Sequence, residues 1–593
     1  MNGSSKRLWY ILAIALVLVL GGGLLAALIQ TDGGKIAIKD VRFVGTNGTL
    51  MSGLLYVPPG ISNTNKAPGI LAIHGYINSR ETQDGFAIEF ARRGYVVLAL
   101  DQTGHGFSAP PALANGFGGP DGLRYLRSLD IVDTKNIGME GHSMGGWASV
   151  IAAGIYTDSY QSIVLEGSST GTYGGKPGTA TFPRNMAVVF SQWDEFSYLM
   201  WGSPVPKDAV KTPKLQAAFG ISPTVVTVNQ LYGSVADGTA RKLYMPRATH
   251  PADHISREAI GDAVEWFQLT LKGGNGLPPS NQIWFWKEIG TFIALIGMVL
   301  FLFPLGALLL RTKFFQSLAE AVPERKGISG IGWWLGALLI VVIPVISYFW
   351  LQHKGNEWFK VGSLWPQSIT IGLMVWAVGN GLLSLVLFLL WHFILNLKKS
   401  GATFAHYGLT WAGKGFDWGK IGKSLLLAIC IIVPAYLLLS LSDWAFKTDF
   451  RLWVLAIKTM TPTHFRIFLS FLIPFTFFFL VLGTVLHGQL RASESLGREM
   501  LVNVLLMITG FIVLLLVQYI PLLSGGTLGL YRFSNGEALL TIVAFQVVPL
   551  LTIVALLSTY FYRKTGHVYV GAFLNAMLIT WIIVAGQATH FAV

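Results

Sequence analysis

Long uninterrupted apolar runs fill the second half of the chain and occur once at its beginning. The first run, residues 8–30, follows Lys6 and Arg7. Each run is close to the roughly 20 residues that a helix needs to cross a bilayer. We therefore predict an N-terminal anchor and eight further membrane-spanning helices. The later spans are expected at about residues 289–310, 331–351, 369–397, 424–441, 466–486, 500–523, 538–561 and 570–590.

The first run is longer than the apolar core of a signal peptide. It ends in "AALIQ", a weak cleavage site at best, so we interpret it as an uncleaved anchor. One further apolar segment, "FRLWVLAIKTM" at 450–460, is too short and too charged to span. For that segment we predict a helix lying in the membrane interface.

Residues 31–283 follow a different pattern, in which short apolar runs alternate with segments of helical periodicity. Such alternation with short connections predicts a mostly parallel sheet covered by helices on both faces, an α/β fold. The expected organisation is an anchor at 1–30, an α/β domain at 31–283 and an all-α membrane domain at 284–593. Strands are predicted at 68–76, 96–108, 136–141 and 162–169, and helices at 86–95, 121–129 and 147–156.

Composition agrees with a large membrane-embedded part. The chain is 52% hydrophobic and only 12% charged, against about 25% charged residues in a soluble protein. The net charge of +13 is scattered in short clusters between apolar runs, so we expect no nucleic-acid partner. A single cysteine, Cys430, excludes an internal disulfide and a cysteine-based metal site.

The basic clusters also predict an orientation. If the nine spans alternate, the basic loops lie on the same side as Lys6 and Arg7. The positive-inside rule makes that side cytoplasmic, so residues 31–283 are expected on the outer face of the cell membrane. The residues concerned are Arg311, Lys313, Arg325, Lys326, Lys398, Lys399, Lys414, Lys420, Lys423, Arg491, Arg498, Arg563 and Lys564.

Two segments match the pattern G-x-S-x-G, residues 141–145 and 167–171. In a chain with 67 glycines the pattern alone carries little information. Ser143 lies between a predicted strand and a predicted helix, where glycines allow the strained turn that exposes a nucleophile. Ser169 is followed by "TGTYGGKPGT", which predicts a loop. Ser143 is therefore the candidate nucleophile.

A serine nucleophile needs a base, and the α/β segment holds only five histidines. His74 ends a predicted strand and is expected to hold its own loop, His105 lies in a glycine turn, and His142 is adjacent to the nucleophile. His250 and His254 remain, in a loop between a strand and the closing helix. We favour His250, which lies nearer the strand end, and keep His254 as the alternative base.

The acid that orients the base is expected between nucleophile and base along the chain. Asp194 and Glu195 follow the apolar run "NMAVVF" after a short turn, "SQW". A carboxylate just beyond a strand end can accept the imidazole N–H and fix its tautomer. Asp194 is the first choice and Glu195 the second, and the alternative for either is a solvated turn residue.

The order Ser143, Asp194, His250 and its strand–turn–helix setting resemble the α/β-hydrolase family. The resemblance covers about residues 36–272 and rests on "HGY", "DQTGHGFS", "GHSMGG", "FSQWDEF" and "THPADHIS" in this order. The chain looks most like the esterase, dienelactone-hydrolase and acyl-peptidase branch. It departs from the pattern in the long stretch between Asp194 and His250 and in having two histidines that compete for one role.

The resemblance implies a serine hydrolase that works through an acyl-enzyme and needs no metal or organic cofactor. It also implies an oxyanion hole made by the backbone N–H groups of Met144 and Tyr76. The expected substrate is an acyl ester of a small molecule, lipid or other amphiphile. Lid-like segments at 170–185 and 199–240 are expected to select it, and the alternative for these segments is ordinary packing on the sheet. A peptidase or amidase with the same triad, and a silent hydrolase-fold receptor on a transport domain, remain alternatives. The later spans contain no Asp or Glu, which disfavours an ion-coupled transporter.

Overall fold

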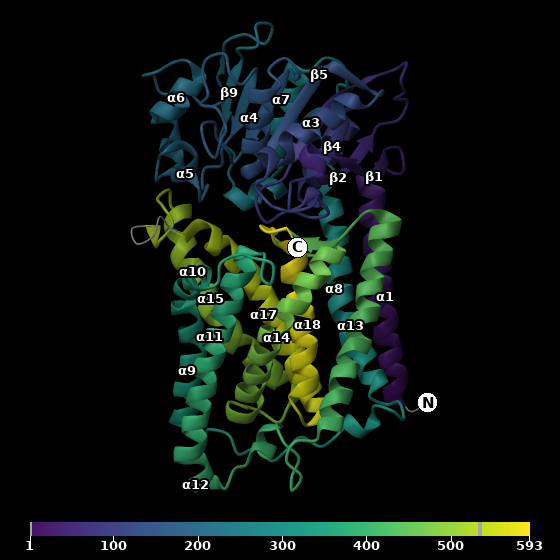
Figure 1. The fold of residues 1–593 in the computed structure, drawn as a ribbon, viewed down its shortest axis with the longest axis vertical. Helices are drawn as coiled ribbons and strands as arrows, with labels where there is room; N and C mark the ends of the chain where they lie inside the picture. The colour runs from purple at the N-terminus through teal and green to yellow at the C-terminus, as the bar shows by residue number, and fades with distance from the viewer. Residues whose placement is uncertain (1–2, 532–536, 593) are drawn as a thin grey trace.

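The computed structural model describes residues 3–531 and 537–592 and shows two halves stacked along the long axis of the molecule (Figure 1). The upper half contains the sheet, and the lower half is a bundle of long helices. The N-terminus lies at the far end of the bundle, and the C-terminus lies between the two halves (Figure 1).

A nine-stranded sheet forms the centre of the upper half, in the order β1-β2-β4-β3-β5-β6-β7-β9-β8. The run from β4 to β9 is parallel, while β1, β2 and β8 pair antiparallel at the edges. Every residue of β3, β4, β6 and β7 is buried, as expected for parallel strands covered on both faces. The strands are β1 (Ala37–Val44), β2 (Leu50–Val57), β3 (Ala67–Ile73), β4 (Val96–Asp101), β5 (Val132–His142), β6 (Ser162–Glu166), β7 (Met186–Val189), β8 (Leu231–Tyr232) and β9 (Arg241–Tyr244).

Helices cover both faces of this sheet and form an apolar core with each face. Helices α3 (Gly119–Ser128) and α4 (Met144–Ile155) pack on one face, and α2 (Asp84–Arg92) and α7 (Arg257–Thr270) pack on the other. The predicted α/β architecture is therefore confirmed. Two shorter helices, α5 (Ser197–Trp201) and α6 (Pro213–Phe219), lie in the long stretch between β7 and β9.

Within the described residues, eight helices are long and apolar enough to cross a membrane, and a bent pair, α9 and α10, makes a ninth candidate span with a 52° bend. The count agrees with the predicted anchor and eight further spans if the bent pair is one span. The helices are α1 (Gly3–Gln30), α8 (Trp284–Leu309), α9 (Ile331–Ile346), α10 (Tyr348–Trp358), α11 (Ser368–Trp391), α12 (Leu397–Ser400), α13 (Trp418–Phe446), α14 (Pro462–Thr484), α15 (Leu496–Leu523), α17 (Ala538–Thr565) and α18 (Tyr569–Gly586).

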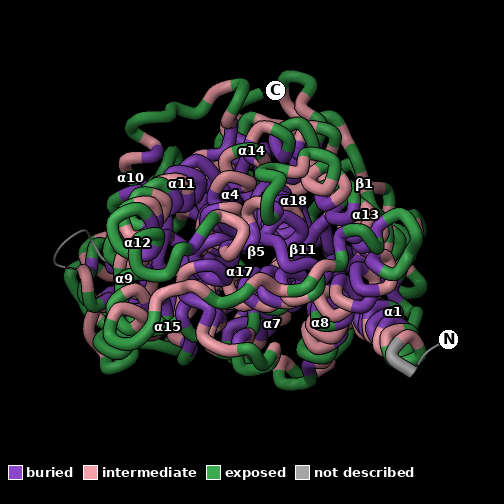
Figure 2. The backbone as a smooth tube through the Cα atoms, turned by 90° about the horizontal axis from the view of Figure 1, so that it is seen from below, coloured by how far each residue is buried: buried purple, intermediate pink, exposed green. Residues whose placement is uncertain are grey.

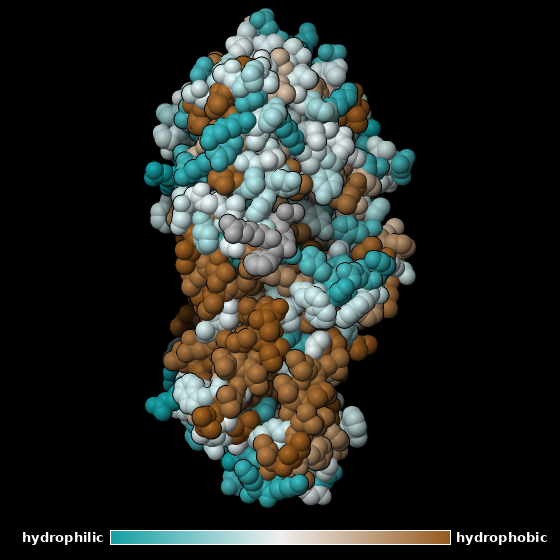
Figure 3. Space-filling model, turned by 90° about the vertical axis from the view of Figure 1, so that its left-hand side faces the viewer, coloured by the Kyte–Doolittle hydropathy of each residue, from teal (hydrophilic) through white to brown (hydrophobic). Residues whose placement is uncertain are grey.

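Hydrophilic side chains gather at both ends of the molecule, with an apolar band over the helices between them (Figure 3). The end of the bundle away from the sheet carries the start of α1, the end of α8, the short helix α12 and the α17–α18 connection (Figure 1). These are the segments that hold the basic clusters. The bundle is thus basic at the end opposite the sheet.

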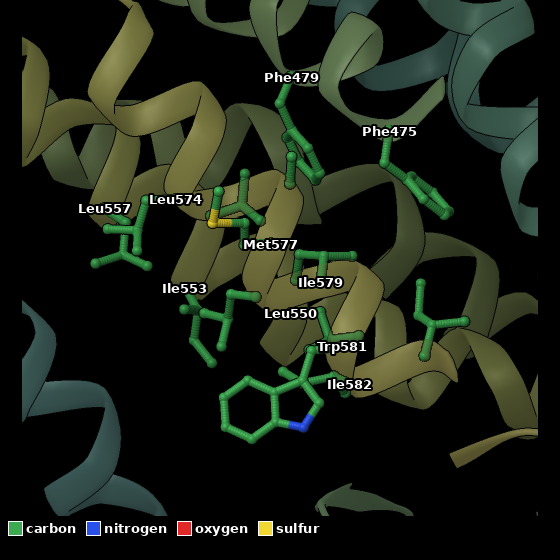
Figure 4. Packing of buried hydrophobic residues seen from close by; sticks show 14 of the residues in the cluster. Phe475, Phe479, Leu550, Ile553, Leu557, Leu574, Met577, Ile579, Trp581 and Ile582 are labelled. Atoms are coloured by element: carbon green, nitrogen blue, oxygen red, sulfur yellow. The ribbon is translucent and has the colours of Figure 1, made fainter. Parts of the chain in front are cut away.

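The bundle is packed around α14, α17 and α18. Buried segments gather near α17 and α18 when the molecule is viewed along its axis, and exposed segments form the rim (Figure 2). Phe475, Leu550 and Met577 contribute to the apolar contacts between these three helices (Figure 4). The Trp581 indole donates to Lys458 O at 2.8 Å, so the polar N–H of this buried side chain is satisfied.

The segment predicted as an interfacial helix is instead a β-hairpin, and that prediction was wrong. Strands β10 (Phe450–Leu452) and β11 (Leu455–Ile457) pair antiparallel around a turn at Trp453. Long-range partners favour this extended form, because the Trp453 indole donates to Pro251 O at 2.8 Å and Arg451 Nη1 donates to Thr82 Oγ1 at 3.1 Å. The hairpin binds the upper half rather than a lipid surface.

Buried charges join the two halves. Glu81 of the upper half lies 3.8 Å from Arg451 and accepts from Ser79 Oγ at 2.6 Å, and Ser79 Oγ in turn accepts from Lys458 Nζ at 2.9 Å. Burial acts to raise the pKa of Glu81, but Arg80, Lys458 and Arg451 hold it below its ordinary value. Because a buried charge without its partner is costly, this network fixes one docking arrangement of sheet and bundle.

Candidate active site

Ser143 occupies the sharp turn between β5 and α4 that the sequence predicts. Its backbone has φ 54° and ψ −119°, a conformation that costs energy for a residue with a side chain. The neighbouring glycines make the turn feasible. A Cβ on Gly145 would lie 2.0 Å from Ile73 O, and one on Gly141 would lie 2.3 Å from Gly145 C. The local sequence therefore presents Ser143 at the end of a buried strand.

Asp194 and His250 meet at the ends of β7 and β9, where Trp193 and Thr249 form a parallel bridge. His250 Nδ1–H donates to Asp194 Oδ2 at 2.8 Å, and Phe196 N–H donates to Asp194 Oδ1 at 2.7 Å. Burial raises the pKa of Asp194, an effect that the Phe196 N–H opposes, and lowers the pKa of His250. A neutral imidazole with its proton on Nδ1 leaves Nε2 free to accept one.

The His74 loop lies directly beside the Ser143 turn. A Cβ on Gly75 would lie 3.1 Å from Ser143 Cβ. His74 Nδ1 is 2.7 Å from Gly75 O, and its Nε2 accepts from Gln102 N at 3.1 Å. His74 therefore holds the loop that carries Tyr76, the role expected for it.

Ser143 and His250 line one cavity of about 340 Å³, together with Tyr76 and Met144. The structure thus brings together the two candidate oxyanion residues, the candidate nucleophile and the candidate base. His254 also lines this cavity.

His254 has no carboxylate partner comparable to Asp194. Its ring packs on the His142 ring at 4.0 Å between centroids. Neither of its buried ring nitrogens has a hydrogen-bond partner among the described residues. His142 Nε2 lies 2.9 Å from His250 O, so it supports the His250 backbone. The geometry therefore favours His250 over His254 as the base.

Glu195 contacts the backbone of the candidate base rather than its ring. His250 N–H donates to Glu195 Oε2 at 2.7 Å. The hydroxyl of Tyr519, on the candidate membrane span α15, donates to Glu195 Oε1 at 2.6 Å. Burial and the nearby Asp194 charge raise the pKa of Glu195 to about 8. Sequence reasoning proposed Glu195 only as a second acid and gave no sign of Tyr519, since 324 residues separate the two.

The helical bundle supplies one wall of the cavity, which sequence reasoning also missed. The expected lid-like segments contribute Tyr173, Leu199 and Met200. His590, near the C-terminus, places Nε2 2.7 Å from the Tyr76 hydroxyl. The lining residues from the bundle and its connections are Trp453, Val454, Leu539, Ile542, Gln546 and His590.

Among the described residues, no group of three or more His, Cys, Asp or Glu side chains is arranged to hold a metal ion.

Comparison with known proteins identifies the class of the upper half. Residues 68–196 match the family model described as alpha/beta hydrolase fold. A serine hydrolase-like protein of Dictyostelium discoideum is 32% identical over 117 residues, which cover 18% of this chain and 32% of that protein. The chain therefore spans about a third of the length of that relative.

Solved structures show the same similarity. An esterase of Pyrococcus furiosus is 16% identical, with 41% of this chain and 94% of that chain covered and a TM-score of 0.30. A hypothetical protein of Pseudomonas aeruginosa is also 16% identical, with 40% and 94% covered and a TM-score of 0.29. By the family match and the observed sheet, the chain combines an α/β-hydrolase fold with a helical region of several candidate membrane spans.

Proposed function

We propose that this chain is a membrane-embedded serine hydrolase that cleaves an acyl ester of a lipid or other amphiphile on the outer face of the cell membrane. The observation that carries the proposal is the shared cavity. Ser143 and an Asp194-paired His250 line the same mostly apolar space, and membrane helix α17 forms part of its wall. Fold alone does not determine reaction, so this site carries the argument.

The proposed reaction follows from the placement of these side chains. His250 Nε2 takes the proton from Ser143 Oγ as that oxygen attacks the acyl carbonyl. Asp194 accepts the Nδ1–H and stabilises the imidazolium that forms. The backbone N–H groups of Tyr76 and Met144 would bind the negative oxygen of the tetrahedral intermediate. The imidazolium then protonates the leaving oxygen, and water releases the acyl group from Ser143.

The depth of the cavity supports a lipidic acyl chain. Leu539, Ile542 and Gln546 line it from α17, and at 1.5 Å per residue they extend over about 10 Å of that helix. Because α17 is long and apolar enough to span a membrane, the cavity borders the first turns of a candidate membrane span. An apolar space in this position suits a hydrocarbon chain better than a soluble polar substrate.

The outer-face location rests on the basic end of the bundle. Arg311 follows the end of α8, Lys398 lies in α12 and Arg563 lies in the last turn of α17, all on the side opposite the sheet (Figure 1). Under the positive-inside rule that end faces the cytoplasm and the active site faces outward. The site would then meet lipids of the outer leaflet.

A membrane-impermeant fluorophosphonate tests this proposal on intact cells that carry the full chain. We expect wild type to be labelled and Ser143→Ala to remain unlabelled, because only an activated serine reacts. Labelling that occurs only after the cells are broken would show that the active site faces the cytoplasm and would contradict the proposed orientation. Absence of labelling in detergent-solubilised wild type would contradict an activated serine and favour a silent receptor.

Replacing Tyr519 by phenylalanine should weaken catalysis although Tyr519 lies on a membrane helix. The variant removes the O–H that holds Glu195 and, through it, the His250 backbone. Above pH 8, where Glu195 is ionised, we expect kcat to fall about tenfold with KM unchanged, the value of one hydrogen bond to a charged group. Losing this donor also raises the pKa of Glu195 further, so a pH–rate inflection near 8 should move upward.

Tyr348→Phe is the matched control, since it removes another buried tyrosine hydroxyl that donates to Leu540 O at 3.1 Å. It should leave both kcat and the pH profile unchanged. Equal losses of kcat in the two variants, or an unchanged pH–rate profile in Tyr519→Phe, would show that Tyr519 contributes packing and does not support catalysis through Glu195.

A further inference from the structure

A second and larger cavity adjoins the first. Its volume is about 740 Å³, and it shares Phe196, Leu199 and Leu539 with the catalytic cavity. Its remaining wall comes from Glu195, from Tyr198 of α5, from helices α10 and α11 and from the start of α17. The polar residues among these are Glu195, Gln352, His353, Asn356, Ser368 and Glu537.

This cavity lies on the His250 side of the catalytic centre. Phe196 packs against the His250 ring at 4.6 Å between centroids, and Glu195 binds the His250 backbone. In ester cleavage the protonated base must reach the leaving oxygen. The leaving group therefore occupies the same side as His250, and the second cavity is the space next to it.

The polar groups of the second cavity indicate the kind of leaving group. Gln352 is only 1% exposed, and no described residue satisfies its Oε1. A buried amide of this kind is costly unless a ligand or water completes its hydrogen bonds. Ser368 and Asn356 pair at 2.7 Å, and His353 and Glu537 pair at 2.9 Å, in the same wall.

The described wall of the second cavity has no cationic Lys or Arg side chain to bind an anionic head group. The described lining residues include two carboxylic acids, Glu195 and Glu537, and no Lys or Arg. Phosphate recognition relies on Arg, Lys or clustered backbone N–H groups. Carboxylates and amides instead suit a hydroxyl group, which both donates and accepts.

We propose that the second cavity binds the leaving alcohol of the ester, and that this alcohol is uncharged and carries several hydroxyl groups, as glycerol does. This inference rests on the proposed function and names its substrate class. When the acyl carbon–oxygen bond breaks, the acyl group stays on Ser143 and His250 gives its proton to the leaving oxygen. The alcohol so formed lies against Gln352, Asn356 and Ser368.

The experiment compares three esters of one fatty acid with the purified full chain in detergent: the glycerol monoester, the methyl ester and the corresponding lysophosphatidylcholine. Wild type should prefer the glycerol monoester over the methyl ester by about tenfold in kcat/KM, the value of one to two hydrogen bonds. Gln352→Leu should remove about fivefold of that preference, the value of one bond. Its methyl ester hydrolysis should be unchanged, which also shows that the variant is folded.

Ser368→Ala provides a second, milder variant with the same expected direction. Gln268→Leu is the matched control, because Gln268 is a glutamine of α7 that lines neither cavity. Equal rates for glycerol and methyl esters, or no effect of Gln352→Leu on their ratio, would overturn the inference. Preference for lysophosphatidylcholine would overturn the uncharged head group. Hydrolysis of none of the three esters would instead contradict the proposed function itself.

Discussion

Ser143→Ala is expected to lower kcat for ester hydrolysis by about 10⁴-fold or more, since nothing else at the turn replaces the nucleophile. The substrate cavity is retained, so KM should change little. The fold should also persist, because Ser143 holds its place through its backbone: its N–H donates to Glu166 O at 2.8 Å. The measurement is steady-state hydrolysis of a fatty ester by purified wild type and variant.

Ser169→Ala is the control for this prediction, because Ser169 belongs to the second G-x-S-x-G segment. Its Oγ lies 2.8 Å from Thr172 Oγ1 and it is fully buried below the cavity wall. Activity should survive that change. Loss of activity in Ser169→Ala but not in Ser143→Ala would show that the nucleophile is Ser169, in the second motif, and that Ser143 is the wrong choice.

The α/β half was predictable because its signals are local. Buried parallel strands such as β3 and β4 are continuous apolar runs, and they are easily separated from the periodic helices between them. The turn at Ser143 was predictable for the same reason. Its glycines lie close together in sequence, and a Cβ at Gly141 or Gly145 would collide with neighbouring backbone atoms.

The order of residues along the chain reduced the candidates for the base and for the acid to two each, but it did not choose between them. Only the pairing of β7 with β9 brings Asp194 to His250, 56 residues away. His254, four residues further on, turns instead toward His142. Strand register, a nonlocal property, therefore separates two histidines that look alike in sequence.

What sequence reasoning missed lies in the contact between the two halves. Trp453, Tyr519 and His590 each reach the catalytic cavity or its acids from segments that read as membrane connections or spans. The hairpin at 450–457 was misread as a helix because its apolar pattern is short and its partners are distant. No local pattern encodes such contacts. Prediction from sequence therefore expected only the lid-like segments of the α/β half around the cavity, whereas in the structure the bundle adds a further wall.

Asp194→Asn is expected to lower kcat about 10⁴-fold while leaving the fold intact. The asparagine amide keeps the size of the side chain but can donate a hydrogen to His250 Nδ1. That bond stabilises the imidazole tautomer with its proton on Nε2, which cannot accept the proton of Ser143. The loss should appear in kcat with a fatty ester and in slower labelling by a fluorophosphonate.

Glu195→Gln separates the two adjacent acids. Its amide oxygen can still accept the His250 N–H, which is 2.7 Å from Glu195 Oε2 in the native chain, so we expect a loss of tenfold or less, the value of one weakened hydrogen bond. The ratio of the two losses tests which acid orients the ring. A larger loss in Glu195→Gln than in Asp194→Asn would make Glu195 the orienting acid, and the helix that carries Tyr519 would then bind the catalytic machinery directly.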